Sequence, residues 1–407
     1  MFTRRRVIGT FIGVSFNPML SALSIGETSL RQRVSDIIQE YSEQGIHRTG
    51  TETDGVSADW LKARISELGV EPAETAFPFK RVEVKSALVR IAGQDMQGVP
   101  LYDCGYTDEK GITGSIGMLG SDADIGVVMI SPFGSDVLHA ARVSGKHKAI
   151  VAVTDEKWPT DGVATVNAED YSNPFGPPVI QIAYQHWGRV RQAVEKGDTG
   201  TVVAQCRYVD AIARNIGATI KGKIAGLDPL VIMTPRSGWW QCASERGGGI
   251  ACWLEMMRAI KEVGPDRDVI FTANTGHELA HLGLDHYLSS HQDLIKGAFM
   301  WVHLGANFAA KYDSKVIVQY SDDQAEAVLK NRLKASNLTA DIEVDGTRRP
   351  WGEARNIYDG KGHYISLLAT NGLFHHPQDV WPDAVDLEKT VGWVSAFSHI
   401  GAELCRI

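Results

Sequence analysis

From residue 230 to the C-terminus, short apolar runs alternate with longer segments of helical periodicity. Neighbouring parallel strands need a crossover connection, which is usually a helix. The alternation therefore predicts a mostly parallel sheet with helices on both faces. The strand-like and helical segments follow one another as 231–233 and 250–263, 269–271 and 279–289, 316–318 and 323–333, with a closing helix over 387–405.

The preceding part of the chain has a different character. Apolar residues at helical spacing predict two helices, over 29–44 and 57–68. Between about 80 and 215, Val- and Ile-rich runs such as 125–130 and 148–153 alternate with Gly, Pro and Asp turns. We therefore predict one α/β domain made of residues 25–80 and 215–407, interrupted by a β-rich insert over 81–214.

The first residues are typical of an export signal. Arg4, Arg5 and Arg6 precede a weakly apolar run that Asn17 and Pro18 interrupt, so the run is too broken for a spanning helix. A charged start, a modest apolar region and small residues near position 24 indicate a removable signal over 1–24. The arginine pair resembles a twin-arginine signal, which predicts a periplasmic or secreted protein. A basic, disordered N-terminus is the alternative.

Composition narrows the class of partner. The 407 residues carry a net charge of −8, which argues against nucleic acid or an anionic membrane as the main partner. Five cysteines are too scattered for a disulfide framework, and none has Cys-x-x-Cys spacing. Whether Cys104 and Cys206 form a bridge stays open.

Polar residues gather where the predicted strands end. His277 and Glu278 follow the run 269–271, and His303 ends the apolar run that begins at Met300. His375 and His376 follow a further apolar segment. Open α/β sheets bind ligands at the carboxyl ends of their strands, so these residues mark the expected active site.

His277, Glu278 and His281 also spell His-Glu-x-x-His, a motif that binds zinc when both histidines lie on one face of a helix. Asn274, Thr275 and Gly276 precede it and favour a turn, so the helix is expected to begin near His277. The motif would then lie at a helix start, and a helical zinc site is the minor alternative. His281 and His286 are interpreted as ordinary helix histidines.

Several segments, in order, resemble the zinc aminopeptidase family that includes bacterial leucyl aminopeptidases, aminopeptidase S and, more distantly, glutaminyl cyclase. The segments that carry the resemblance are 45–51, 245–255, 276–283 and 375–379. The resemblance implies a three-layer α/β/α domain, and residues of about 80–215 look like the protease-associated domain inserted in some members.

The resemblance also implies a damaged metal site. The bridging acid of the family corresponds to Glu245, the second glutamate to Glu278 and the last histidine to His375. The segment that supplies the first family ligands reads Pro235-Arg236-Ser237 and cannot provide them. One divalent metal ion, expected to be zinc, is therefore predicted on Glu245, Glu278 and His375, with His303 nearby.

Further roles follow by position. His277 stands where the family places its general base, and a neutral imidazole can accept a proton near neutral pH. Arg236 is expected to replace the charge of a lost metal ion and to contact Glu245 or an acidic group of the substrate. The residues expected to bind substrate are Trp239, Trp240, Arg246 and His376; core tryptophans and solvated arginines are the alternative interpretation.

The resulting hypothesis is a metal-dependent hydrolase of an amide or related bond in a small or peptide-like substrate. Two alternatives remain. One is a catalytically inactive binding protein on the same fold. The other is a lyase or cyclase that uses a single zinc ion, as glutaminyl cyclase does.

Overall fold

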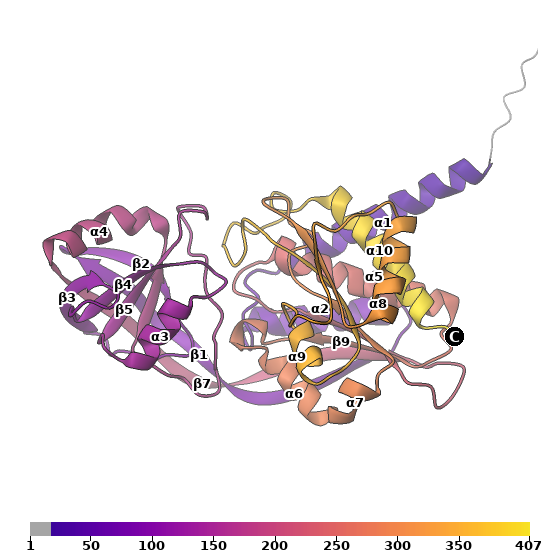
Figure 1. Ribbon diagram of the computed structural model, residues 1–407, viewed down its shortest axis with the longest axis horizontal. Helices are drawn as coiled ribbons and strands as arrows, with labels where there is room; N and C mark the ends of the chain where they lie inside the picture. Colours follow the sequence, from indigo (N-terminus) through magenta and orange to yellow (C-terminus); the bar gives the residue numbers. More distant parts are fainter. Residues whose placement is uncertain (1–17) are drawn as a thin grey trace, which may run out of the picture.

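The computed structural model describes residues 18–407, with side chains from residue 30 onward. The twin-arginine segment at Arg4 and Arg5 lies outside these described residues. Figure 1 shows two lobes side by side, and the larger one contains both ends of the described chain. No helix among the described residues is long and apolar enough to cross a membrane.

The larger lobe is built on a mostly parallel sheet, as the sequence predicts. Strands β9, β8, β10 and β13 lie next to one another and run parallel. Antiparallel neighbours, β7 on one side and β11 on the other, flank them. The bounds are β8 Leu230–Pro235, β9 Val269–Asn274, β10 Met300–Leu304, β11 Val316–Tyr320, β12 Ile342–Val344 and β13 Tyr364–Ala369.

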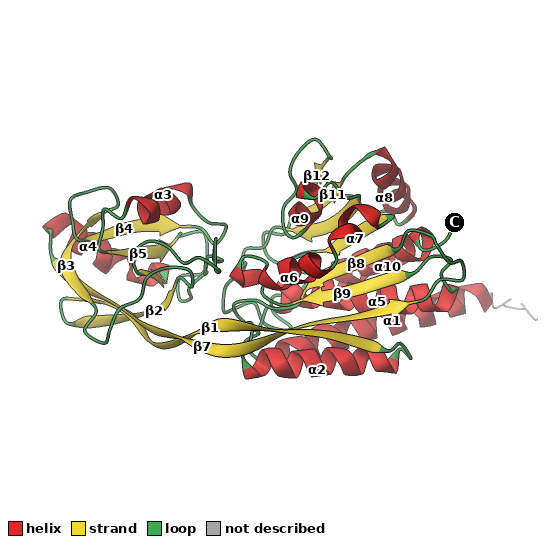
Figure 2. Ribbon diagram, turned by 90° about the horizontal axis from the view of Figure 1, so that it is seen from below, coloured by secondary structure: helices red, strands yellow, loops and turns green. Residues whose placement is uncertain are grey.

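Helices cover both faces of this sheet (Figure 2). Along β8, Leu230 and Ile232 face one buried cluster, whereas Val231 and Met233 face another. The first cluster includes side chains of α1 Pro18–Glu43, α2 Glu52–Glu67, α5 Gly248–Val263, α8 Asp323–Ala335 and α10 Leu387–Leu404. The second includes side chains of α6 Leu282–Ser290, α7 Gln292–Gly297 and α9 Ala354–Asp359. This is a three-layer α/β/α arrangement, and the expected fold class is confirmed.

Two long strands connect the lobes. Strand β1, Pro72–Ile91, pairs antiparallel with β7, Thr199–Ile220, along nearly its whole length, and Figure 2 shows them running side by side into the smaller lobe. The smaller lobe has buried clusters of its own. Its other elements are β2 Gln94–Pro100, β3 Ile112–Met118, β4 Ile125–Ile130, α3 Asp136–Ser144, β5 Ala149–Thr154, β6 Val179–Ile182 and α4 Trp187–Lys196.

Glycine allows α5 to start directly above the carboxyl ends of the central strands. A Cβ at Gly249 would lie 2.8 Å from the Thr234 hydroxyl oxygen and 3.1 Å from the Leu304 carbonyl oxygen. A side chain there would push α5 away from β8 and β10. Glycine at this position therefore holds the preceding turn, which carries Glu245, close to the strand ends.

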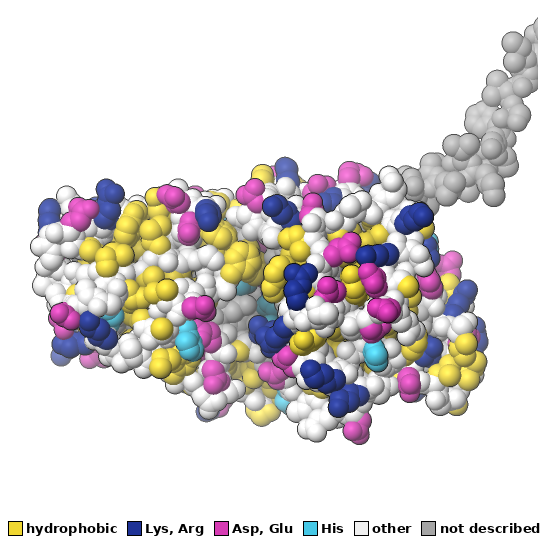
Figure 3. All heavy atoms as spheres, in the orientation of Figure 1, with side chains coloured by type: hydrophobic (Ala, Val, Ile, Leu, Met, Phe, Trp, Pro, Cys, Tyr) yellow, Lys and Arg dark blue, Asp and Glu magenta, His cyan; other side chains and the backbone are white. Residues whose placement is uncertain are grey.

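Acidic and basic side chains are interspersed on the face of the larger lobe drawn in Figure 3. No continuous basic field covers that face, which agrees with the net charge of −8. This distribution gives no support to nucleic acid as a partner.

Arg214 of β7 ties the lobe-connecting strands to α2. Its guanidinium group donates to Glu74 of β1 at 2.8 Å and to Asp59 of α2 at 2.6 Å. The hydrogen bond from Arg214 is the main cause that lowers the pKa of Glu74 to about 2. Because that carboxylate is stabilised in the folded state, Glu74 contributes stability above its unfolded pKa of about 4.3.

We predict that Glu74→Gln lowers the free energy of unfolding at pH 7 by about 1 kcal/mol, the upper range for a partly exposed ion pair. The difference from wild type should shrink as the pH falls from about 4.3 toward about 2, where wild-type Glu74 is protonated as well. Urea unfolding at several pH values measures it, with the exposed Glu71→Gln as control. A difference that stays constant over this pH range would contradict the assignment.

Candidate active site

The expected site residues lie at the carboxyl ends of the central parallel strands. Ser237 follows β8, His277 and Glu278 follow β9, and His303 is the fourth of five residues of β10. His375 follows β13. Glu245 and Arg246 lie on a π-helical turn, Ala243–Gly247, that leads into α5. All of these side chains are buried, and the sheet topology brings them together from segments far apart in the sequence.

The turn after β9 differs from the helix start that the sequence predicts. His277–Leu279 forms a single 3-10 turn, and α6 begins only at Leu282. Ala280 and His281 have left-handed backbones with φ of 59° and 66°. Such conformations cost about 1–3 kcal/mol for residues other than glycine, and they concentrate at functional sites.

This turn places two histidines face to face. The His277 and His281 rings stack with centroids 4.9 Å apart, although they do not share a helical face. The helical zinc geometry is therefore not formed. The interpretation of His281 as an ordinary helix histidine is also wrong, because His281 precedes the helix and its ring points into the cluster.

A third side chain completes a group that fits a metal ion. One ligand atom from each of His277, His281 and Glu353 lies within 4.8 Å of the other two, and all three residues are buried. The Glu353 carboxylate is 3.2 Å from His277 Nδ1 and 4.0 Å from His303 Nε2. Glu353 lies in the loop before α9 and was not singled out from the sequence. The pair His277 and His281, four residues apart, was the one signal that pointed here.

Neighbouring groups orient these rings. His281 Nδ1 lies 2.9 Å from Asn356 Oδ1, and the Asn356 amide in turn donates to Asp285 at 2.8 Å. His303 Nδ1 lies 2.8 Å from the Ser366 hydroxyl. Hydrogen bonds of this kind fix the tautomer and ring orientation of metal-binding histidines.

Protonation states also suit a metal ion. Burial lowers the pKa of His281 and of His303 to about 3, and it lowers the pKa of His277 well below its usual range. These imidazoles are neutral at pH 7, as metal ligands must be. Burial raises the pKa of Glu353 to about 8, so this carboxyl is protonated at pH 7 and would have to release its proton to bind a metal ion. Glu353 Oε2 and His303 Nε2 are buried without a hydrogen-bond partner in the described chain. Two or three imidazoles and a carboxylate are a donor set that zinc accepts.

The predicted metal set does not come together. Within residues 30–407, Glu245, Glu278 and His375 do not form a group of mutually close ligand atoms. Both oxygens of Glu278 are already engaged, one by the Thr49 N–H at 2.7 Å and the other by the Ser237 hydroxyl at 2.7 Å. These two hydrogen bonds direct the Glu278 carboxylate toward Thr49 and Ser237, the residue that follows strand β8.

Glu245 is paired with an arginine. Arg246 Nη2 lies 2.7 Å from Glu245 Oε1, and His375 Nε2 lies 3.4 Å from the same oxygen. Burial opposes ionisation of Glu245, but Arg246 and His375 outweigh it and lower the pKa of this carboxyl to about 2. The Arg246 Nε donates to the Ser237 carbonyl at 2.7 Å, Nη2 forms the ion pair with Glu245, and Nη1 is buried without a hydrogen-bond partner.

Arg236 does not take the role expected of it. Its guanidinium group is fully buried and lies 2.8 Å from Asp54 Oδ1 rather than beside Glu245. It also donates to the carbonyl oxygens of Asp54 at 3.1 Å and Arg214 at 2.6 Å. Asp54 lies in the first turn of α2, 182 residues away, so no local pattern indicated the pairing. The cation that contacts Glu245 is Arg246.

The smaller lobe contributes directly to the site. The Thr165 carbonyl oxygen lies 2.8 Å from His375 Nδ1, and the Thr165 N–H donates to the His375 carbonyl at 3.2 Å. The Ala168 N–H donates to the Glu278 carbonyl at 3.0 Å. Residues 165–168 thus cross the site between His375 and Glu278, and they enclose it.

The remaining predicted residues lie around this contact. Trp239 is buried and donates to Asn167 Oδ1 at 2.7 Å, and Trp240 donates to the His375 carbonyl at 2.8 Å. His376 is buried, and a Cβ at Gly162 of the smaller lobe would meet its ring at 2.2 Å. These three side chains join the lobes and support His375.

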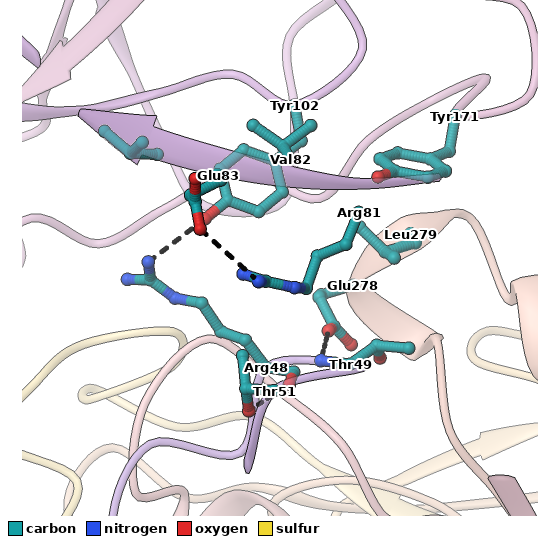
Figure 4. Close-up of a pocket in the computed structure, with 11 residues that line it drawn as sticks. Arg48, Thr49, Thr51, Arg81, Val82, Glu83, Tyr102, Tyr171, Glu278 and Leu279 are labelled. Atoms are coloured by element: carbon teal, nitrogen blue, oxygen red, sulfur yellow. Dashed lines mark hydrogen bonds and ion pairs between the residues drawn. The ribbon is translucent and has the colours of Figure 1, made fainter. Parts of the chain in front are cut away.

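A small pocket opens beside Glu278. It has a volume of about 200 Å³ and lies where the smaller lobe meets the larger one, between Tyr102 and Tyr171 on one side and Thr49 on the other (Figure 4). Arg48 and Arg81 also line it. Glu278 and Leu279, which follow His277 directly, form part of its lining.

Comparisons with known proteins agree with the expected resemblance at the level of the fold. No family model matches the sequence, and no curated protein matches it significantly. Among solved structures, a zinc aminopeptidase from Bacillus subtilis superposes with a TM-score of 0.73 at 16% identity, covering 93% of this chain and 94% of that chain. A peptidase M28 precursor from Shewanella amazonensis gives 0.73 at 14% identity, covering 95% and 97%. An aminopeptidase from Aneurinibacillus sp. strain AM-1 gives 0.68 at 16% identity, covering 92% and 94%. The chain therefore has the zinc aminopeptidase fold over nearly its whole length.

We predict that Arg236→Met lowers the free energy of unfolding by about 3–5 kcal/mol, because it leaves the buried Asp54 carboxylate unpaired. The double variant Arg236→Met with Asp54→Leu should recover part of that loss, since no lone buried charge remains. Urea unfolding of both variants and wild type measures this. If the Arg236→Met variant were as stable as wild type but had lost metal binding, the role in the active site that the sequence predicted for Arg236 would be supported instead.

Proposed function

We propose that this chain is a hydrolase that uses a single metal ion, expected to be zinc, held by His277, His281 and Glu353 with His303 alongside. The observation that carries the proposal is the group of three buried ligand atoms within 4.8 Å of one another. The supporting chemistry is a pair of neutral imidazoles next to a buried carboxyl that has one oxygen without a hydrogen-bond partner. The site residues thus differ from the set inferred by resemblance.

A bound zinc ion would polarise a scissile carbonyl group and lower the pKa of a water molecule. His375 is the candidate proton acceptor in place of His277. Its Nδ1 faces the Thr165 carbonyl and its Nε2 faces Glu245, so the carboxylate would stabilise the charge that the ring gains with a proton.

Arg246 supports the assignment of one ion rather than two. Its guanidinium group is adjacent to Glu245 and acts electrostatically on His277, His303 and Glu353. A divalent ion on Glu245 would be repelled most strongly, because the guanidinium group already lies 2.7 Å from the Glu245 carboxylate. The Nη1 N–H groups of Arg246, which have no hydrogen-bond partner, are also suited to a carbonyl oxygen that becomes negative during reaction.

The proposed reaction is cleavage of an amide or related bond in a small or peptide-like substrate. The names of the similar structures, a zinc aminopeptidase and a peptidase, support this class. An inactive binding protein and a single-zinc lyase or cyclase are the competing functions.

We also propose export to the periplasm or beyond, which rests on the arginine pair at Arg4 and Arg5 and the apolar run that follows.

We predict one zinc ion per chain in protein purified with zinc and then dialysed. His281→Ala and Glu353→Gln should each lower the content to near zero, because a site that loses one of its few ligands binds far more weakly. His286→Ala is the matched control: it changes a histidine of α6 that stacks on Phe77 outside the group, and it should retain one ion. Elemental analysis decides this. A content unchanged in Glu353→Gln would exclude the proposed ligand set.

We further predict that zinc-loaded wild type hydrolyses members of a library of short peptides and N-acyl amino acids, and that His375→Ala lowers the rate by about 10²–10⁴-fold while keeping the zinc. Mass spectrometry in ¹⁸O-labelled water detects the reaction. Label in the product identifies hydrolysis. A product without label would establish the lyase or cyclase, and zinc binding without any product would favour the binding protein.

A further inference from the structure

The pocket beside Glu278 combines two arginines with walls from both lobes. Arg48 and Thr49 belong to the larger lobe, whereas Tyr102 and Tyr171 belong to the smaller one. In Figure 4 the guanidinium groups of Arg48 and Arg81 extend toward Tyr102 and Glu83, and Glu278 turns toward Thr49. The arrangement of charge in this pocket indicates what it binds.

Arg48 is a rigidly held cation without an acidic partner. Its Nε donates to the Trp239 carbonyl at 3.1 Å, and its Nη1 donates to the Tyr102 hydroxyl at 3.0 Å. The guanidinium carbon lies 5.0 Å from the centre of the Trp240 ring and 5.6 Å from that of Trp239. No carboxylate of residues 30–407 forms an ion pair with Arg48. Its position is thus fixed by neutral groups, and its charge is left uncompensated.

Arg81 is only weakly compensated. Its contact with Glu83 is long, at 3.8 Å, and its Nε is buried without a hydrogen-bond partner. Glu83 is paired more closely with Arg207, which lies outside the pocket. Glu278 is engaged by the Thr49 N–H and the Ser237 hydroxyl. Neither acid of the pocket is ion-paired with Arg48, and Arg81 has only the 3.8 Å contact with Glu83, whereas Glu278 is turned toward Thr49 and Ser237.

We propose that this pocket binds a carboxylate of the substrate through Arg48 and Arg81. Guanidinium groups bind carboxylates through paired, charge-assisted hydrogen bonds. A volume of about 200 Å³ suits one amino-acid side chain or a chain end rather than a whole peptide. The carboxylate belongs either to an acidic side chain or to the C-terminus of the substrate.

The pocket is well placed to position such a substrate, and this step rests on the proposed hydrolase function. Glu278 and Leu279 form part of its lining, and they share a single turn with the candidate metal ligand His277. A substrate anchored at Arg48 and Arg81 would have its neighbouring bond next to that turn. Specificity for acidic substrates would then come from residues of both lobes.

Calorimetric titration of the full chain with three probe peptides tests the proposal. The probes are trialanine with a free C-terminus, trialanine amide, and Ala-Glu-Ala amide with a blocked N-terminus. We expect one or both carboxylate probes to bind at least 10-fold more tightly than trialanine amide, and the stronger of the two identifies the source of the carboxylate. Arg81→Gln should remove that preference, and Arg48→Lys should reduce it.

Two controls sharpen the test. Arg191→Gln changes an exposed arginine of α4 outside the pocket and should leave binding unchanged. Glu83→Gln removes a competing acid and should strengthen binding. His281→Ala is expected to lose the metal ion but to keep the carboxylate preference. This variant therefore distinguishes a failure of the proposed metal site from a failure of the proposed carboxylate pocket. Equal binding of all three probes, absence of binding by all, or an unchanged preference in Arg81→Gln would overturn the proposal.

Discussion

The turn between β9 and α6 is the constraint on which the site depends. Gly276 begins it with φ of 79°, and its N–H donates to the hydroxyls of Thr49 and Ser237, both at 2.8 Å. A Cβ at Gly283 would lie 2.1 Å from the Thr275 carbonyl oxygen, so the start of α6 presses directly on the end of β9. This close approach compresses the chain into a left-handed turn. The same turn directs Glu278 toward Ser237 and the two histidine rings toward Glu353.

Ion pairs and hydrogen bonds near this turn engage two of the acids that the resemblance marked as metal ligands. Arg246 and His375 satisfy Glu245, and Ser237 and Thr49 satisfy Glu278. Buried atoms without a hydrogen-bond partner remain on Glu353 and His303, and also on Glu245, His375 and Arg246. Arg246 places a positive charge beside Glu245, and the proposed ion would place one beside Glu353. The smaller lobe closes the arrangement through Thr165 and Ala168, which couples the lobe contact to the chemistry.

The alternation of strand and helix in the sequence was sufficient to predict the sheet and its helical layers, because periodicity reflects burial on each element. It also placed His277, Glu278, His303 and His375 at one edge. The partners were less predictable. Glu353 meets His277 across 76 residues, and Arg236 meets Asp54 across 182. The sequence also did not reveal that Arg246, rather than Arg236, pairs with the buried Glu245, because neighbouring positions in a motif do not show where a long side chain points. A left-handed backbone at Ala280 and His281 has no clear signature in residue type, and the histidine pair was consequently assigned to a helix.

The central claim concerns the position of one metal ion, and anomalous diffraction from crystals of the zinc-loaded protein tests it most directly. Data collected on both sides of the zinc absorption edge locate the ion without reference to activity. The account predicts one peak within about 2.0–2.2 Å of a nitrogen of His277, a nitrogen of His281 and an oxygen of Glu353. A peak between Glu245 and His375, or two peaks of comparable height, would contradict it.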